Sequence, residues 1–146
     1  MTSTESAADK PQLITPTFVL AWVANFCQFL VFYLSVTTMA LYAVESFGAS
    51  DTVGGFASSA FVLGATCMRV FSGWIVDRVG HKKAALTSLV FVTVVAVAYF
   101  FAYNVAVLII VRMVHGAGYA LTSTALMAVA QSVIPHERRA EGTGYL

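Results

Sequence analysis

Charge is what this sequence has least of. Of its 146 residues only 10% are charged, whereas 59% are hydrophobic and the mean hydropathy is +0.82. Soluble domains carry about 25% charged residues and need a polar surface that this chain lacks the residues to build. The composition therefore excludes an ordinary soluble domain and favours a protein that lies in lipid. A net charge of only +1 gives no sign of a nucleic-acid partner.

Cysteine is also scarce. Cys27 and Cys67 both stand in apolar runs, with no Cys-x-x-Cys or Cys/His spacing around them. They form either a disulfide or metal site or two small buried hydrophobic positions, and the spacing favours the second. The sequence has no phosphate-binding motif and no nucleophile placed beside a base. We therefore expect no metal, no cofactor and no enzymatic activity.

What the sequence has in abundance is long apolar runs. Four of them cover about residues 18–44, 52–76, 84–103 and 105–133. A helix needs about 20 residues to cross about 30 Å of hydrocarbon, and each run reaches that length. The alternating pattern of a membrane barrel is missing, and helices satisfy their own backbone hydrogen bonds in lipid. We predict an all-α integral membrane protein with a polar tail at 1–16 and one membrane domain at 17–146.

The basic residues predict how the chain lies in the membrane. Three occur between the second and third runs and two after the fourth: Arg78, Lys82, Lys83, Arg138 and Arg139. The breaks at 45–51 and at Tyr103 and Asn104 contain no base. Because short cytoplasmic loops are enriched in Lys and Arg, the N-terminus and both basic segments are predicted to be cytoplasmic. We expect a multi-pass protein of the cell membrane.

The segment 73–83 has a distinctive spacing, Gly-x-x-x-Asp-Arg-x-Gly followed by bases. Gly73 leaves room for a neighbouring helix, and Gly80 permits a turn that a β-carbon hinders. Asp77 is placed to accept hydrogen bonds from a helix N-terminus. The bases Arg78, Lys82 and Lys83 can pair with acids or with lipid phosphate. An ordinary positive-inside loop is the alternative; it explains the bases but not the glycine and Asp-Arg spacing.

This segment resembles the signature between the second and third helices of the major facilitator superfamily of secondary transporters, with His81 a mild departure. The resemblance implies a conformational-gating role for Gly73, Asp77, Arg78, Gly80, Lys82 and Lys83. The fourth run is similar to the family's Arg-x-x-x-Gly-x-Gly pattern, associated with proton-coupled members, at Arg112, His115, Gly116 and Gly118. Residues 134–142 resemble the loop that follows the family's fourth helix.

Arg112 carries the strongest physical signal in the fourth run. An arginine near the bilayer centre costs roughly 2.5–3.5 kcal/mol on insertion scales, so it usually faces a cavity or a partner. Proton coupling is the favoured interpretation, and a structural role, in which Arg112 holds a carbonyl of a neighbouring helix, is the alternative. His115 shares the face of Arg112. A packing hydrogen bond is the favoured role of His115, ahead of a proton relay.

A polar stripe on the first run predicts a cavity surface. Asn25, Gln28 and Phe32 share one helical face, and Tyr119 and Ser123 extend the Arg112 face of the fourth run. In the family the first and fourth helices line the central cavity, so the resemblance makes these residues candidates for substrate contact. Polar contacts between packed helices, worth roughly 1 kcal/mol or less each, are an equally good interpretation.

The function predicted from these features is secondary active transport by alternating access, most of all proton-coupled export of small organic molecules or drugs. An uptake symporter for a sugar or metabolite and a non-transporting remnant or scaffold are the alternatives. The expected partners are membrane lipid, a small-molecule substrate, protons and the remaining helices of the transporter, and no nucleic acid. Because the family fold has twelve helices, four spans and a fifth helix starting at about 140 predict a fragment.

Overall fold

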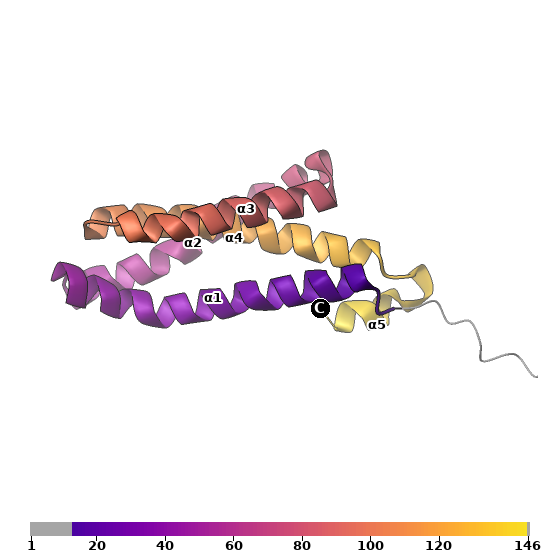
Figure 1. Cartoon of the computed structure of the whole chain (residues 1–146), viewed down its shortest axis with the longest axis horizontal. Helices are drawn as coiled ribbons and strands as arrows, with labels where there is room; N and C mark the ends of the chain where they lie inside the picture. Colours follow the sequence, from indigo (N-terminus) through magenta and orange to yellow (C-terminus); the bar gives the residue numbers. More distant parts are fainter. Residues whose placement is uncertain (1–12, 146) are drawn as a thin grey trace, which may run out of the picture.

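The chain folds into helices throughout the part that the structure describes. The computed structural model describes residues 13–145, so most of the predicted tail 1–16 lies outside the described residues, as does Leu146. In chain order the elements are α1 (Pro16–Phe47), α2 (Asp51–Val79), α3 (His81–Ala98) with a 3₁₀ turn (Tyr99–Phe101), α4 (Val105–Ser132), a second 3₁₀ turn (His136–Arg138) and α5 (Arg139–Gly144). Four of these helices are long and apolar enough to cross a membrane (Figure 1). The predicted all-α membrane fold is confirmed.

Short polar residues define where the long helices begin. Thr15 caps α1, its hydroxyl accepting a hydrogen bond from the amide of Phe18 at 3.2 Å, and Pro16 follows at the first helical position. Asn104 caps α4 in the same way, through a 2.8 Å bond from Val107. The cap explains why a hairpin of only a few residues suffices between α3 and α4.

The connection between α2 and α3 differs from the expected polar break at residues 77–83. Asp77 and Arg78 belong to the last turns of α2, and α3 begins at His81, so Gly80 alone separates the two helices. Charged side chains at the rim of a membrane extend toward water while their backbone stays helical. For this reason the apolar runs at 52–76 and 84–103 mark the hydrocarbon crossing but not the ends of the helices.

Gly80 turns the chain through a backbone conformation, φ 93° and ψ 138°, that L-residues rarely adopt. We expect Gly80→Ala to lower the free energy of unfolding by about 1–3 kcal/mol, the usual cost of such backbone strain. Gly73→Ala is the matched control, because Gly73 lies within α2 and no atom lies within 4 Å of the position of an added β-carbon. Thermal unfolding of the purified chain measures both, and equal melting temperatures would contradict the assigned role of Gly80.

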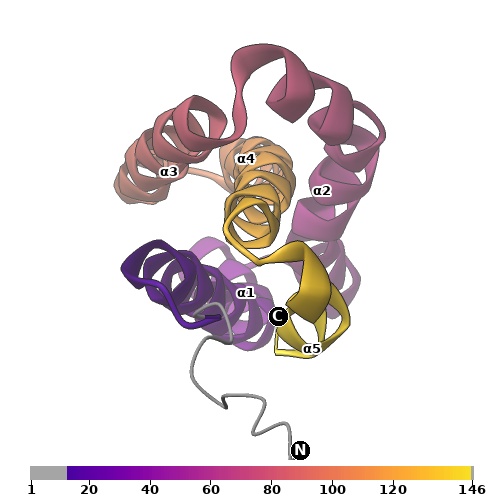
Figure 2. The ribbon, with the colours of Figure 1, turned by 90° about the vertical axis from the view of Figure 1, so that its right-hand side faces the viewer.

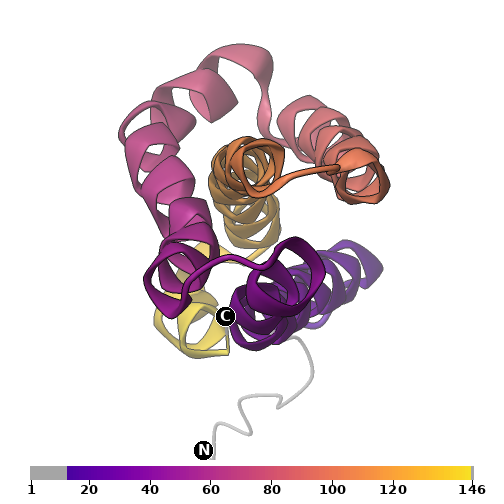
Figure 3. The ribbon, with the colours of Figure 1, turned by 90° about the vertical axis from the view of Figure 1, so that its left-hand side faces the viewer.

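The fourth helix forms the centre of the bundle. Figures 2 and 3 show α4 between α1, α2 and α3, and it carries more buried residues than the other spans. Near the α5 end, buried side chains from α1, α2 and α4 meet Leu13 and Ile134 in one apolar cluster. Near the other end, Ala43, Ala57 and Leu108 form a second cluster. The core is thus a layer of small and apolar side chains around α4.

The outer faces of the bundle are apolar as well. Large side chains such as Leu20, Val70 and Phe100 are 71%, 77% and 89% exposed. Cys27 and Cys67 also lie exposed and unbridged, so the expectation that both are buried is wrong for the described chain. Apolar exposure on this scale fits lipid or further helices as the surroundings rather than water.

All predicted basic segments lie at one end of the bundle. The start of α1, the connection between α2 and α3 and the segment that follows α4 share this end, whereas the α1–α2 and α3–α4 connections lie at the opposite end (Figure 1). We call the first the basic end, defined by Lys82, Lys83, Arg138 and Arg139.

Candidate functional site

The segment 73–83 presents its charges on the surface of the basic end. The carboxylate of Asp77 lies 3.9 Å from Nε2 of His81, and its side chain is 80% exposed. The guanidinium of Arg78 lies 5.0 Å above the ring of Trp74. No side chain caps the N-terminus of α3, so Asp77 does not make the hydrogen bonds to a helix N-terminus that were expected of it. Lys82 and Lys83 are exposed in the first turn of α3.

Gly73 does not mark a close approach within this chain. No atom of the described residues lies within 4 Å of the position that a β-carbon would take on it. The close approaches lie elsewhere, at Gly64 on α2 and Gly116 on α4, where an added β-carbon would collide with the backbones of Met113 and Phe61 respectively. Gly118 instead faces α3, 2.9 Å from the side chains of Phe91 and Val92 when a β-carbon is added. The two glycines of the fourth helix therefore pack against different neighbours.

Arg112 is fully buried between α4 and α2. Its Nε donates to the carbonyl of Ala57 at 3.3 Å and its Nη2 to the carbonyl of Ser58 at 2.8 Å. The guanidinium also lies 5.0 Å from the ring centre of Phe61, within range of a cation–π contact. Its Nη1 is buried with no hydrogen-bond partner among the described residues. The two bonds to carbonyls are the contacts expected if Arg112 has a structural role. Its Nη1 remains without a partner in the part of the chain that the structure describes.

His115 makes a hydrogen bond between helices. Its Nδ1 lies 3.0 Å from the hydroxyl of Tyr99, and the residue is only 3% exposed. Its ring also meets the edge of Phe61, with 5.4 Å between ring centres. The contact is of the packing type expected for His115.

The candidate cavity residues fall into two groups. Asn25, Tyr119 and Ser123 line one pocket of about 410 Å³ between α1, α2 and α4, together with Phe29, Arg69, Thr124, Met127, Ala128 and Gln131. Phe32 is not among the residues that line this pocket; its ring centre lies 5.3 Å from that of Phe61 and 5.7 Å from that of Tyr119. Gln28 is buried and is not among the residues that line this pocket. We call the pocket the polar cavity.

Arg69 is the charged residue among those that line the cavity, and it is not one of the residues predicted from the sequence. It is exposed on α2, and its Nη2 lies 3.5 Å from the hydroxyl oxygen of Ser123 on α4. The sequence contains a feature that indicates such a role, because Arg69 stands inside the apolar run 52–76 and an arginine in such a run usually faces a cavity or a partner.

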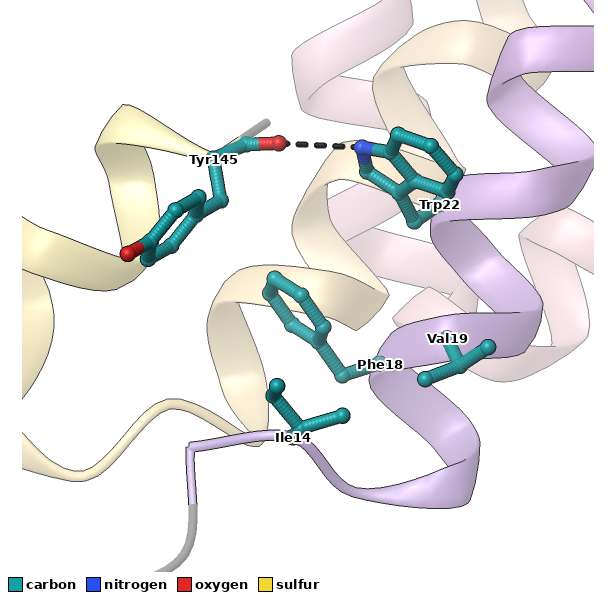
Figure 4. A pocket seen from close by; sticks show the side chains of 5 residues that line it. All are labelled: Ile14, Phe18, Val19, Trp22 and Tyr145. Atoms are coloured by element: carbon teal, nitrogen blue, oxygen red, sulfur yellow. Dashed lines mark hydrogen bonds between the residues drawn. The ribbon is translucent and has the colours of Figure 1, made fainter.

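A second pocket, between α1 and α5, is apolar. Figure 4 shows Ile14, Phe18, Val19, Trp22 and Tyr145 around a space of about 310 Å³. The indole of Trp22 donates to the carbonyl of Tyr145 at 2.9 Å and ties the two helices together. Within residues 13–145, no charged side chain lines it. A binding site usually combines an apolar lining with a few converging polar groups, so this pocket is assigned to helix packing.

The segment after α4 is held by an ion pair at the basic end. Nη2 of Arg138 donates to Oε1 of Glu141 at 2.8 Å, and this contact raises the pKa of the Arg138 guanidinium above its ordinary value. Gly142 in α5 packs closely on Leu13 and Ile134. The start of α5 is thereby fixed against the base of α1 and the end of α4.

Four long apolar helices, with a cavity between α1, α2 and α4 and a buried guanidinium on α4, are the features of an integral membrane protein. The profile of the Major Facilitator Superfamily matches residues 21–146. The chain belongs to this family, whose members carry small molecules across membranes and are generally not enzymes. Lipid surroundings and a small-molecule substrate follow from that membership. Searches of curated proteins and of solved structures found no match.

Proposed function

We propose that this chain takes part in proton-coupled export of small organic molecules by alternating access. The observation that carries the proposal is the polar cavity between α1, α2 and α4, about 410 Å³ in volume, in a bundle that otherwise presents apolar faces. This volume lies within the range of small-molecule sites. The cavity residues Asn25, Tyr119 and Ser123 are the proposed substrate contacts, and Arg69 joins them.

The segment 73–83 is proposed to act as a gate at the basic end. Asp77, Arg78, Lys82 and Lys83 are exposed there, which leaves them available to the remaining helices of the transporter. Charge pairs between this segment and the remaining helices would keep the cavity closed at the basic end. The pairs would break when the two halves of the transporter move against each other. We propose that this end, with the N-terminus, is cytoplasmic in the cell membrane, because it carries the bases Arg78, Lys82, Lys83, Arg138 and Arg139.

Arg112 is the proposed element of proton coupling within this chain, with His115 packed one helical turn away. Arg112 is a buried charge whose Nη1 has no hydrogen-bond partner among the described residues. A carboxylate supplied by the remaining helices would lose or gain a proton according to whether it pairs with this guanidinium. The coupling then appears as substrate movement that requires a proton gradient.

Membrane vesicles of opposite orientation test this function. In everted vesicles that are acidified inside by respiration, an exporter is expected to accumulate at least one probe among benzenesulfonate, phenyltrimethylammonium and glucose, and a protonophore should abolish the accumulation. Accumulation only in energised right-side-out vesicles would identify an uptake symporter. Equal probe contents with and without the chain in both preparations would identify a non-transporting remnant. Labelling of Lys82 and Lys83 by an impermeant amine reagent in everted vesicles alone checks the proposed orientation.

A further inference from the structure

We propose that the polar cavity binds organic anions, whose negative group pairs with Arg69. This assigns a substrate class to the site described above and rests on the proposed transport function. The anion sits between α1, α2 and α4, with its apolar or aromatic body against the rings that line the same cavity.

The depth of the cavity is the first support. Asn25, Arg69 and Ser123 each lie about 14 Å from the end of their helix at the basic end, at 1.5 Å of rise per residue. Because the apolar run of α2 ends at residue 76, Arg69 lies about 10 Å inside the hydrocarbon layer, which is about 30 Å thick. A lipid headgroup stays at the interface, so an anion held at this depth comes from a solute and not from the bilayer.

The charge balance of the cavity is the second support. Arg69 is its single charged residue, and no acidic side chain lines the cavity within residues 13–145. The ion pair of Arg138 with Glu141 and the contact of His81 with Asp77 both lie at the basic end. A guanidinium is costly at this depth unless an opposite charge accompanies it, and an anionic solute supplies that charge.

An unpaired polar atom is the third support. Asn25 is only 8% exposed, and its Oδ1 is buried without a hydrogen-bond partner among the described residues. A buried acceptor left unsatisfied costs about 1–3 kcal/mol. Asn25 lines the cavity from α1 and Arg69 lines it from α2, so the amide that carries this unpaired oxygen and the guanidinium border the same space.

The lining selects the body of the solute. The rings of Phe29 and Tyr119 meet edge to face, with 6.2 Å between their centres, and Met127 lies beside them in the lining. Aromatic rings and a thioether pack well against another aromatic ring. The expected ligands are therefore small aromatic sulfonates, carboxylates or phosphates rather than inorganic ions.

Equilibrium dialysis tests the assignment on the full 146-residue chain in phosphatidylcholine nanodiscs. Three radiolabelled probes share one ring and differ in charge: benzenesulfonate, benzenesulfonamide and phenyltrimethylammonium. We expect benzenesulfonate to bind at least tenfold more tightly than the other two. Arg69→Gln should abolish this preference, whereas Arg69→Lys should retain most of it. Arg139→Gln removes an equal charge at the basic end, far from the cavity, and should change nothing.

The outcomes separate this inference from the transport function. Equal binding of the three probes, no binding of any, or a preference that survives Arg69→Gln in a folded variant would each overturn the anion assignment. Circular dichroism and the binding of Arg69→Lys establish that the fold is retained. Energised flux of a cation or sugar without anion binding would leave the transport proposal standing and remove the substrate class. Anion binding without flux in either vesicle type would keep the anion assignment and contradict the transport function.

Discussion

Gly116→Leu is expected to separate α4 from α2 and to lower the free energy of unfolding by about 3 kcal/mol or more. A β-carbon on Gly116 would overlap the carbonyl group of Phe61, so a leucine requires the two backbones to move apart. Overpacking a filled interior usually costs about 1–3 kcal/mol, and here rigid backbone rather than a movable side chain stands in the way. Helices in lipid associate mainly through such close packing, since water does not drive them together.

The matched control for this substitution is Gly55→Leu on α2. Gly55 is exposed, and no atom of residues 13–145 lies within 4 Å of the position of its added β-carbon. Its replacement should leave stability unchanged or raise it, because glycine is a poor helix former by about 1 kcal/mol. Thermal unfolding of the two purified variants in the same detergent gives the comparison. Melting temperatures lowered equally in both would show that the close approach at Gly116 is unimportant.

Arg112→Met is expected to reduce proton-driven accumulation of substrate at least tenfold. The variant should be nearly as stable as the parent chain. Exchanging a buried charge for an apolar side chain of similar size is often neutral or stabilising. The carbonyls of Ala57 and Ser58, which Arg112 contacts, belong to the interior of α2 and retain the hydrogen bonds of the helix. What the methionine removes is the charge to which a coupling carboxylate would respond.

Two assays distinguish coupling from structure at this position. Accumulation of substrate in energised everted vesicles requires coupling, whereas exchange of substrate at equal concentrations on both sides does not. We expect Arg112→Met to lose the first and keep the second, and Arg112→Lys to keep a part of both. A variant that melts far below the parent chain and loses both activities together would make Arg112 a structural clamp between α2 and α4.

The helical content of this chain follows from its sequence with little ambiguity. Apolar runs of about 20 residues satisfy their backbone in lipid only as helices, so four spans were expected and four are found. The ends of these helices were less predictable. Asp77 and Arg78 look like a loop by polarity, yet they continue α2, because side chains at the membrane rim reach water without unwinding the backbone.

The candidate site was predictable to a smaller extent. Asn25, Tyr119 and Ser123 share a cavity as the helical spacing suggested, whereas Gln28 on the same stripe does not line it. Spacing along one helix identifies a face but not the neighbour that the face meets. Arg69 was missed for the same reason, since its cavity exists only where α1, α2 and α4 converge.

By itself the sequence determined that the chain lies in the membrane, that it forms four helices, that its bases gather at one end and which family it resembles. These properties depend on composition and on short spacings, which do not require distant residues to meet. Only the tertiary structure decided that α4 is central, that Gly116 rather than Gly73 allows two backbones to touch, and that Arg69 and Asn25 line one cavity. Each of these features depends on which helices pack against one another. The helices have similar apolarity, so their composition does not predict the pairing, and only the packed structure shows it.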